Sequence, residues 1–220
     1  MKRVIDFFSE LQQNNNKPWF DAHKAQYKEM LAFHNDFSEK LIAGIAKFDK
    51  SVEGLKVKDC TYRIYRDLRF SPDKTPYKQH IGTFICPHGK KSGYAGYYLH
   101  IEPNVKYFLC TGLWMPEPRF TKSVREEIML NGKDFEAAIK KAKGFSLSWD
   151  DALKKIPNGF NPDDEFAKYY RLKSFLIEKE IDEKYLLDEH LLEHAIEDFR
   201  KTYEFNRLLN KSVEYAIEMF

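Results

Sequence analysis

The sequence has little of what marks secreted, zinc-binding or membrane-spanning proteins. It contains three cysteines, Cys60, Cys86 and Cys110, an odd number whose spacing matches no zinc-binding pattern. No apolar run approaches the roughly 20 residues that a membrane helix needs. Asp6 and Glu10 interrupt the apolar pattern of residues 1–16, which therefore do not resemble a secretory signal. We expect buried thiols in a reducing compartment, and a soluble, cytoplasmic protein with no membrane partner.

An excess of one charge is also lacking. The 36 Lys and Arg residues are nearly balanced by 34 Asp and Glu residues, which leaves a net charge of +2. This balance argues against general attraction to nucleic acid or to a membrane surface, so a basic binding site has to be local. The chain also has no internal repeat, low-complexity tract or glycine-rich linker, and its 220 residues fit a single domain.

What the sequence does have is many aromatic side chains, 18 Phe, 13 Tyr and 3 Trp, which supply buried area for a core. Residues 1–50 show helical spacing, residues 60–116 alternate with a period of two, and residues 117–220 are mostly helical. The predicted strands are residues 61–70, 78–86, 94–102 and 105–115, with 146–149 and 173–180 added. Short connections imply antiparallel neighbours. The prediction is an α+β domain in which N-terminal and C-terminal helices flank one antiparallel sheet of about five or six strands.

Two breaks are predicted within the helical regions. Asn14, Asn15 and Asn16 end the first helix, because asparagine tolerates the left-handed conformation, and they cap the next helix, whose first turn holds Pro18. The apolar stripe of residues 189–220 changes register near Glu204, which predicts a second break there.

The most unusual segment is residues 62–80, where basic and aromatic side chains are concentrated, and we call it the basic segment. Five cations in this segment are opposed by only Asp67 and Asp73. The cations are Arg63, Arg66, Arg69, Lys74 and Lys78. Arginine suits bidentate recognition of phosphate or carboxylate, and tyrosines add stacking faces. The segment is a candidate anion-binding site, and the alternative is a network of salt bridges to these aspartates and to acidic helices.

Strand parity gathers a second group of side chains on one face of the sheet. His100 and Glu102 share this face with three glycines, Gly82, Gly96 and Gly112. Glycine in a strand often marks the close approach of a ligand or of another backbone. The face is therefore either the floor of a pocket or a groove into which a helix packs, such as the C-terminal one. The candidate ligand-binding residues are Arg63, Arg66, Arg69, Lys74, Lys78, Tyr65, Tyr98 and Trp114.

His80, His100 and Glu102 are the candidate catalytic residues, because histidine titrates near neutral pH and a carboxylate can accept a proton. The same trio has a composition that could ligate a metal. No compact HxH or HExxH motif is present, so we predict no metal site and no cofactor. Cys86 lies close to His88 in the sequence, but the intervening Pro87 leaves their relative direction undetermined, which argues against a nucleophilic pair.

Two stretches are too specific to be generic, NNNKPWF at residues 14–20 and YRIYRDLRFSPDKTPYK at residues 62–78. Together with LHIEP at residues 99–103 and GLWMP at residues 112–116, they resemble a widespread family of microbial proteins known only as a domain of unknown function. The resemblance covers nearly the whole chain and implies one domain of this size. It brings no established activity, cofactor or catalytic residue. One departure is VKY at residues 105–107, where the resemblance implies a glycine-rich step.

These observations lead to three hypotheses about function. The preferred one is a domain that binds a small anionic, phosphate-bearing ligand, with the question of enzymatic activity left open. The second is a nucleic-acid-binding module, in which arginines contact phosphates and tyrosines stack on bases, although the balanced charge argues against it. The third is a protein-interaction or scaffold domain without catalysis.

Overall fold

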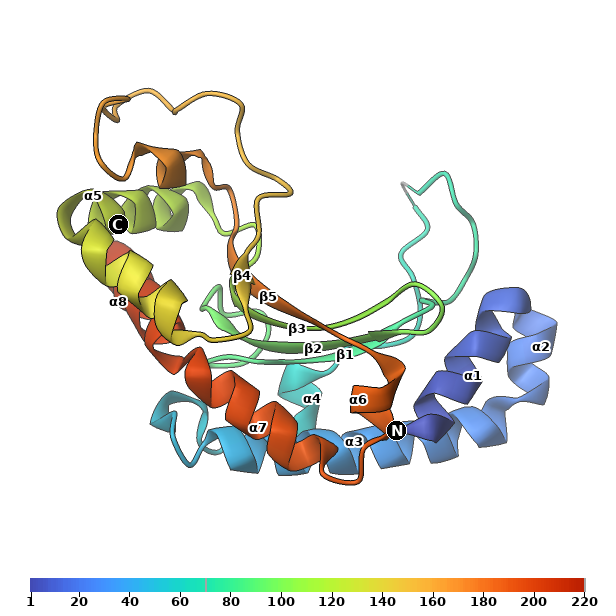
Figure 1. Ribbon diagram of the computed structural model, residues 1–220. Coiled ribbons are helices and arrows are strands. Elements are labelled where there is room, and N and C mark those ends of the chain that lie inside the picture. Colours follow the sequence, from blue (N-terminus) through green and yellow to red (C-terminus); the bar gives the residue numbers. More distant parts are fainter. Residues whose placement is uncertain (70, 220) are drawn as a thin grey trace.

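A computed structural model describes residues 1–69 and 71–219, so Phe70 of the predicted strand 61–70 and Phe220 of the predicted closing helix lie outside the described residues. Within these ranges the chain forms one antiparallel sheet with helices before and after it (Figure 1). The predicted α+β fold class is therefore confirmed. No helix in the same ranges is both long and apolar enough to cross a membrane.

In the described residues the sheet has five strands in the order β1–β2–β3–β5–β4, and every neighbouring pair is antiparallel. The strands are β1 (Ile81–Ile85), β2 (Gly96–Glu102), β3 (Lys106–Leu113), β4 (Ser146–Leu147) and β5 (Phe175–Ile181). Four of them fall within predicted strand ranges, and β5 extends one residue beyond the predicted range 173–180. Asn104 closes the turn between β2 and β3 with a positive φ of 60°, a conformation that asparagine adopts at low cost. The turn therefore forms without the glycine-rich step that the resemblance implies.

Most helical elements fall in the predicted helical regions 1–50 and 117–220, and α4 lies outside both regions. Before the sheet lie α1 (Lys2–Gln13), α2 (Lys17–Ala22), α3 (Lys24–Ile45), the 3-10 turn η1 (Lys50–Val52) and α4 (Val57–Cys60). From β3 onwards lie α5 (Pro118–Lys141), η2 (Ala167–Arg171), α6 (Glu183–Leu187), α7 (Leu191–Lys201) and α8 (Tyr203–Met219). Helix α5 is kinked at Asn131, and the break between α7 and α8 falls at Thr202, close to its predicted place.

The three asparagines after α1 organise the N-terminal helices. Asn14 has a φ of −134°, so it ends α1 without the left-handed conformation that we expected. The side chain of Asn15 exchanges hydrogen bonds of 2.9 and 3.1 Å with the backbone of Tyr77. Asn16 accepts a bond of 3.0 Å from the amide of Trp19 and caps α2. The motif therefore ties the N-terminal helices to the end of the basic segment.

The basic segment is a loop, and the prediction of a strand over residues 61–70 is wrong. Its described residues form two isolated bridges, Thr61 with Thr83 and Tyr65 with Tyr77. Elsewhere the segment rises from the edge of the sheet, at the right of Figure 1. Pro72 and Pro76 lie in its returning half, and proline has no amide hydrogen to donate to a strand ladder.

The two faces of the sheet have different surroundings. Helices α3, α4, α6 and α7 lie on one side, which we call the covered face (Figure 1). The side chains of Leu99 and Ile101 are fully buried on this face. The other side, which we call the open face, lies between the basic segment at one end and α5 with residues 148–172 at the other (Figure 1). Tyr98 and Glu102 point to the open face and keep partial exposure, so solvent reaches it.

Candidate functional site

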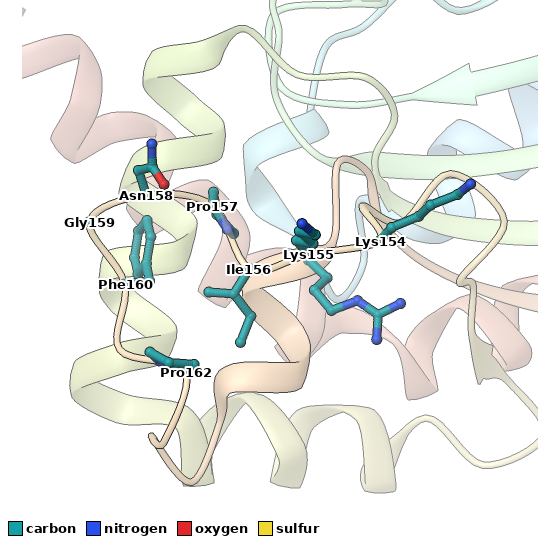
Figure 2. A pocket seen from close by; sticks show the side chains of 9 residues that line it. Lys154, Lys155, Ile156, Pro157, Asn158, Gly159, Phe160 and Pro162 are labelled. Atoms are coloured by element: carbon teal, nitrogen blue, oxygen red, sulfur yellow. The ribbon is translucent and has the colours of Figure 1, made fainter.

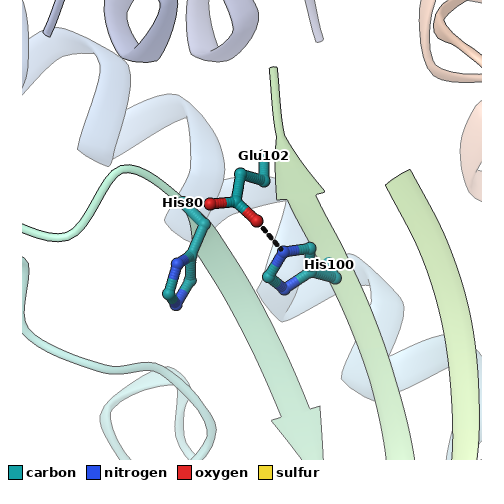
Figure 3. A group of neighbouring side chains, drawn as sticks. All are labelled: His80, His100 and Glu102. Carbon is teal, nitrogen blue, oxygen red and sulfur yellow. Dashed lines mark hydrogen bonds and ion pairs between the residues drawn. The ribbon is translucent and has the colours of Figure 1, made fainter. Parts of the chain in front are cut away.

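The predicted trio of His80, His100 and Glu102 comes together on the open face (Figure 3). His100 and Glu102 are alternate residues of β2, and His80 directly precedes β1, next to the register pair of Ile81 and Ile101. One donor atom of each trio residue lies within 4.8 Å of the others. Antiparallel pairing of β1 with β2 therefore assembles three side chains that are separated in the sequence.

Both ring nitrogens of His100 have hydrogen-bonding partners, and its ring lies between those of Phe108 and His80. Its Nε2 lies 3.3 Å from Oε2 of Glu102, and its Nδ1 lies 2.9 Å from the hydroxyl of Tyr98. The ring stacks on Phe108 of β3, with centroids 4.6 Å apart and planes inclined by 18°. The ring of His80 lies 4.9 Å away on the β1 side. His100 is therefore fixed in both position and ring orientation.

Burial sets the protonation states in the cluster. Burial lowers the pKa of His100, and the hydrogen bond to Glu102 only partly opposes this effect. Burial also lowers the pKa of His80, again opposed by Glu102 and reinforced by Lys78 and then Lys106. Both imidazoles are therefore neutral at neutral pH and keep one nitrogen lone pair each. Burial raises the pKa of Tyr98, whose hydroxyl keeps its proton.

The glycines of the open face do not form a single row. Gly96 and Gly112 are partners in the register, whereas Gly82 lies further along the sheet. A Cβ atom on Gly82 would lie 2.5 Å from the ring of Tyr98, so the missing side chain makes room for that ring. A Cβ atom on Gly112 would lie 3.2 Å from the ring of Phe205 in α8. The C-terminal helix α8 thus approaches the sheet at Gly112. Gly82 instead makes room for Tyr98, a side chain of the candidate site.

Three of the five cations in the basic segment bind other groups of the same loop. Arg66 donates to Asp73 and to the hydroxyls of two other loop residues, and Arg69 forms bonds of 3.0 and 2.6 Å with the carboxylate of Asp67. Lys74 donates to a backbone carbonyl of the same loop at 3.0 Å. Arg66 and Arg69 thus form the contacts of the salt-bridge alternative, whereas Lys74 binds the backbone of the loop.

Arg63 and Lys78 have different surroundings. Within residues 1–69 and 71–219, neither forms an ion pair with a carboxylate. The ammonium group of Lys78 lies 5.3 Å from the centroid of the Tyr62 ring. Burial lowers the pKa of Lys78, and the nearby positive charge of Arg63 lowers it further. These two cations therefore lie close together, and Lys78 acts in turn on His80.

Lys106 is a third cation at the cluster, and our sequence analysis missed it. It begins β3 opposite Glu102 in the register, and its ammonium group lies 4.9 Å from the centroid of the Phe108 ring. It contributes to lowering the pKa of both His80 and His100. In the described chain it forms no ion pair with a carboxylate. Lys106, Phe108 and Cys110 are alternate residues of one predicted strand, so the sequence already indicated that their side chains share a face.

Two predicted ligand-binding residues lie away from the cluster. Tyr65 packs at the base of the loop, with its ring centroid 5.5 Å from that of Tyr77 and 6.2 Å from that of Phe20. Trp114 is 74% exposed and follows the end of β3 opposite to Lys106. Neither residue is brought to the trio by the fold.

The cysteines are buried free thiols. Burial raises the pKa of Cys60 to about 12 and that of Cys86 to about 11, so both stay protonated at neutral pH. The Sγ atom of Cys86 lies 3.7 Å from the hydroxyl of Ser92, and the ring of His88 packs against Tyr94. These contacts argue against a Cys86–His88 nucleophilic pair.

A hollow of about 620 Å³ lies in the loop of residues 154–162, away from the trio (Figure 2). Lys154, Lys155 and Arg171 contribute to its lining. Arg171 donates from Nε to the carbonyl of Leu153 at 2.7 Å and so holds the loop closed, while both lysines are exposed. The hollow therefore has the character of a loop surface, and the trio is the stronger candidate for a functional site.

No curated protein and no solved structure matches the chain. A family model described as conserved hypothetical protein (DUF2461) matches residues 3–207, a range that includes the motifs at residues 14–20 and 62–78. Because this match covers most of the chain, the protein belongs to the conserved hypothetical protein family DUF2461.

Proposed function

We propose that the protein binds a small anionic, phosphate-bearing ligand on the open face. The supporting observation is that Lys106 lies near both neutral histidines, Lys78 lies near His80, and Arg63 lies near Lys78. None of these three cations forms an ion pair with a carboxylate in the described residues. Like charges held close together repel each other, and a bound anion relieves that repulsion. The neutral imidazoles and the hydroxyl of Tyr98 add hydrogen-bonding groups beside this charge.

The trio would supply the chemistry if the bound ligand is a substrate. Glu102 and the two histidines lie next to each other and next to the cations, so they can exchange protons with a ligand held there. The nucleic-acid alternative is weaker, because the exposed rings of Tyr65 and Trp114 lie apart and do not make a continuous stacking surface with the cations.

Thermal unfolding in phosphate and in chloride at equal ionic strength tests the proposal, with chelator-treated protein throughout. A ligand at 100 times its Kd stabilises the folded state by about 2.7 kcal/mol. For a chain of this size, that gain corresponds to a rise in Tm of about 5–10 °C. Excluded anions stabilise any folded protein, so only the part of the shift that depends on the site is informative.

Two variants separate the part of the Tm shift that depends on the site from the general effect of phosphate. Lys78→Gln/Lys106→Gln removes two cations of the open face and should lose the phosphate-specific shift. Arg69→Gln removes one positive charge from the same loop, where Arg69 is already bound to Asp67, and should keep the shift. An equal shift in the wild type and in both variants would show that phosphate does not bind at this face.

A further inference from the structure

Two donors of the trio, on His100 and Glu102, have the spacing that a metal ion needs, and His80 lies near them. Protein ligands lie about 2.0–2.2 Å from Zn²⁺, so neighbouring donor atoms are roughly 3.0–3.5 Å apart. His100 Nε2 and Glu102 Oε2 are 3.3 Å apart. One donor atom from each of His80, His100 and Glu102 lies within 4.8 Å of the other two. Figure 3 shows the carboxylate of Glu102 between the two histidine side chains. A change of side-chain rotamer of the half-buried His80 would be needed to bring its donor atom to this spacing.

The donor types also indicate which ion fits. Two imidazoles and one carboxylate suit Zn²⁺ and neighbouring divalent transition metals, whereas Mg²⁺ and Ca²⁺ prefer oxygen ligands. Three protein ligands leave at least one coordination position for water or for a bound molecule, as in catalytic rather than structural zinc sites. Our sequence analysis predicted no metal site because it looked for compact motifs, whereas these ligands come from two paired chain segments.

The contact between Tyr98 and His100 is a second, independent observation. Binding of a metal at Nε2 of His100 requires the tautomer in which Nδ1–H donates to the Tyr98 oxygen at 2.9 Å, and the lone pair of Nε2 then lies on the side of Glu102. Metal-bound histidines are usually oriented by such a partner on the other ring nitrogen. Stacking on Phe108 fixes the ring plane, and Gly82 leaves the space that Tyr98 occupies.

A purely structural role explains the cluster less well. One bond between His100 and Glu102 would satisfy both groups without the second histidine. In the described residues no hydrogen bond engages either ring nitrogen of His80, although its ring lies 4.9 Å from that of His100. A metal ion gives this half-buried side chain a partner.

We propose that His80, His100 and Glu102 bind one divalent transition-metal ion, with Zn²⁺ as the representative. This metal site is argued from its three ligands and does not depend on the proposed anion binding. Its coupling to a phosphate-bearing ligand rests on the proposed function: two neutral imidazoles and one carboxylate leave the ion with net positive charge. Beside Lys78 and Lys106, the ion attracts phosphate oxygens into its remaining coordination positions.

The test uses the full chain after removal of metals with a chelator. Calorimetric titration with Zn²⁺ should give one equivalent per chain, and titration with Co²⁺ should give the visible spectrum of a site with imidazole ligands. Glu102→Gln and His80→Gln should each weaken binding at least tenfold. Unchanged Tm of the metal-free variants shows that they still fold.

The chain offers a matched control in α7 and just before it. His190 and His194 are exposed and four residues apart, with carboxylates of Glu189 and Asp188 at 3.5 and 3.9 Å. Such a pair is a plausible place for non-specific metal binding. His190→Gln/His194→Gln should leave stoichiometry and affinity unchanged. The inference is wrong if this control loses binding, or if Glu102→Gln and His80→Gln bind Zn²⁺ as the wild type does.

Phosphate titration of the metal-free protein keeps the two proposals apart. Zn²⁺ binding at the trio without a phosphate-specific shift supports the metal site and overturns the anion proposal. A phosphate-specific shift without Zn²⁺ binding supports the anion proposal and overturns the metal site. A phosphate-specific shift that increases when Zn²⁺ is added supports the coupling of the two.

Discussion

Each face of the sheet carries a polar cluster built around a histidine, and the two clusters have different characters. On the covered face, His34 of α3 is fully buried and lies 3.3 Å from the hydroxyl of Thr83, which lies 2.7 Å from the hydroxyl of Ser38. On the open face, His100 contacts the carboxylate of Glu102 at 3.3 Å. The first cluster joins a helix to the sheet, and the second joins groups that can bind a proton, an anion or a metal.

Alternation along single strands produces this difference. Leu99 and His100 are neighbours in β2, as are Phe108 and Leu109 in β3, and in each pair the leucine points into the covered face. The covered face supplies the apolar area that stabilises the fold. The open face is thereby free to carry ionisable side chains that would be costly in the core.

The largest expected effect on the free energy of unfolding comes from shortening a buried side chain of the covered face. Leu109→Ala should lower the free energy of unfolding by about 2–5 kcal/mol, because Leu109 is fully buried and the change leaves a cavity. Lys106→Ala, three residues away in the same strand and exposed, should change it by less than about 0.5 kcal/mol. Urea denaturation measures both. Similar losses in the two variants would contradict the assignment of the faces.

The second effect is a pH dependence that belongs to the covered face. Burial lowers the pKa of His34 from 6.5 to about 4. Between these values the unfolded chain binds a proton that the folded chain does not, so stability falls as pH decreases through this window. The loss at acid pH reaches about 3 kcal/mol.

Urea denaturation of the wild type and of His34→Gln across this window isolates the contribution of His34, because glutamine binds no proton. The two stability curves should converge as the pH falls. Curves that stay parallel would mean that His34 is not held neutral by its surroundings.

The same alternation explains which parts of the fold and site were predictable. His100 and Glu102 share the parity of β2, and the short connection between β1 and β2 implied the antiparallel pairing that brings His80 beside them. These features depend on spacing along the chain, which the sequence displays directly. The five strands of the described residues were predicted for the same reason.

The basic segment was less predictable because its contacts depend on how a loop turns back on itself. Arg66 reaches Asp73, seven residues ahead, whereas Arg69 reaches back to Asp67. No periodicity specifies such pairings, so the sequence could not separate these arginines from Arg63. Alternating Tyr62, Ile64 and Leu68 resembled a strand, but the hydrogen bonds of Arg66 and two prolines close the segment as a loop instead.

A smaller effect sharpens the role of the open face. Tyr98→Phe keeps the ring over Gly82 and removes the hydroxyl that contacts Nδ1 of His100. Loss of such a partner typically weakens metal binding about 10-fold to 100-fold. We expect weaker Zn²⁺ binding and an altered Co²⁺ spectrum, with little change in Tm of the metal-free protein. Unchanged Zn²⁺ affinity would show that Tyr98 does not position His100 for a metal.

The smallest expected effect is confined to the basic segment and separates its two kinds of arginine. The side chain of Arg66 is 24% exposed and donates to three side chains across the loop, those of Asp73, Ser71 and Thr75. The side chain of Arg69 is 77% exposed and binds Asp67, two residues away. The bonds of Arg66 join the rising and returning halves of the loop, so their loss opens the loop locally.

Hydrogen exchange followed by mass spectrometry measures this opening. Arg66→Gln should speed amide exchange several-fold in peptides covering residues 61–80 and leave β1 to β3 unchanged, because the covered face still holds the strands. Arg69→Gln should leave exchange in the same peptides unchanged, since an exposed pair between near neighbours adds little order. Faster exchange in both variants, or in β1 to β3 after Arg66→Gln, would contradict the distinction between Arg66, which joins the two halves of the loop, and Arg69, which pairs with a near neighbour.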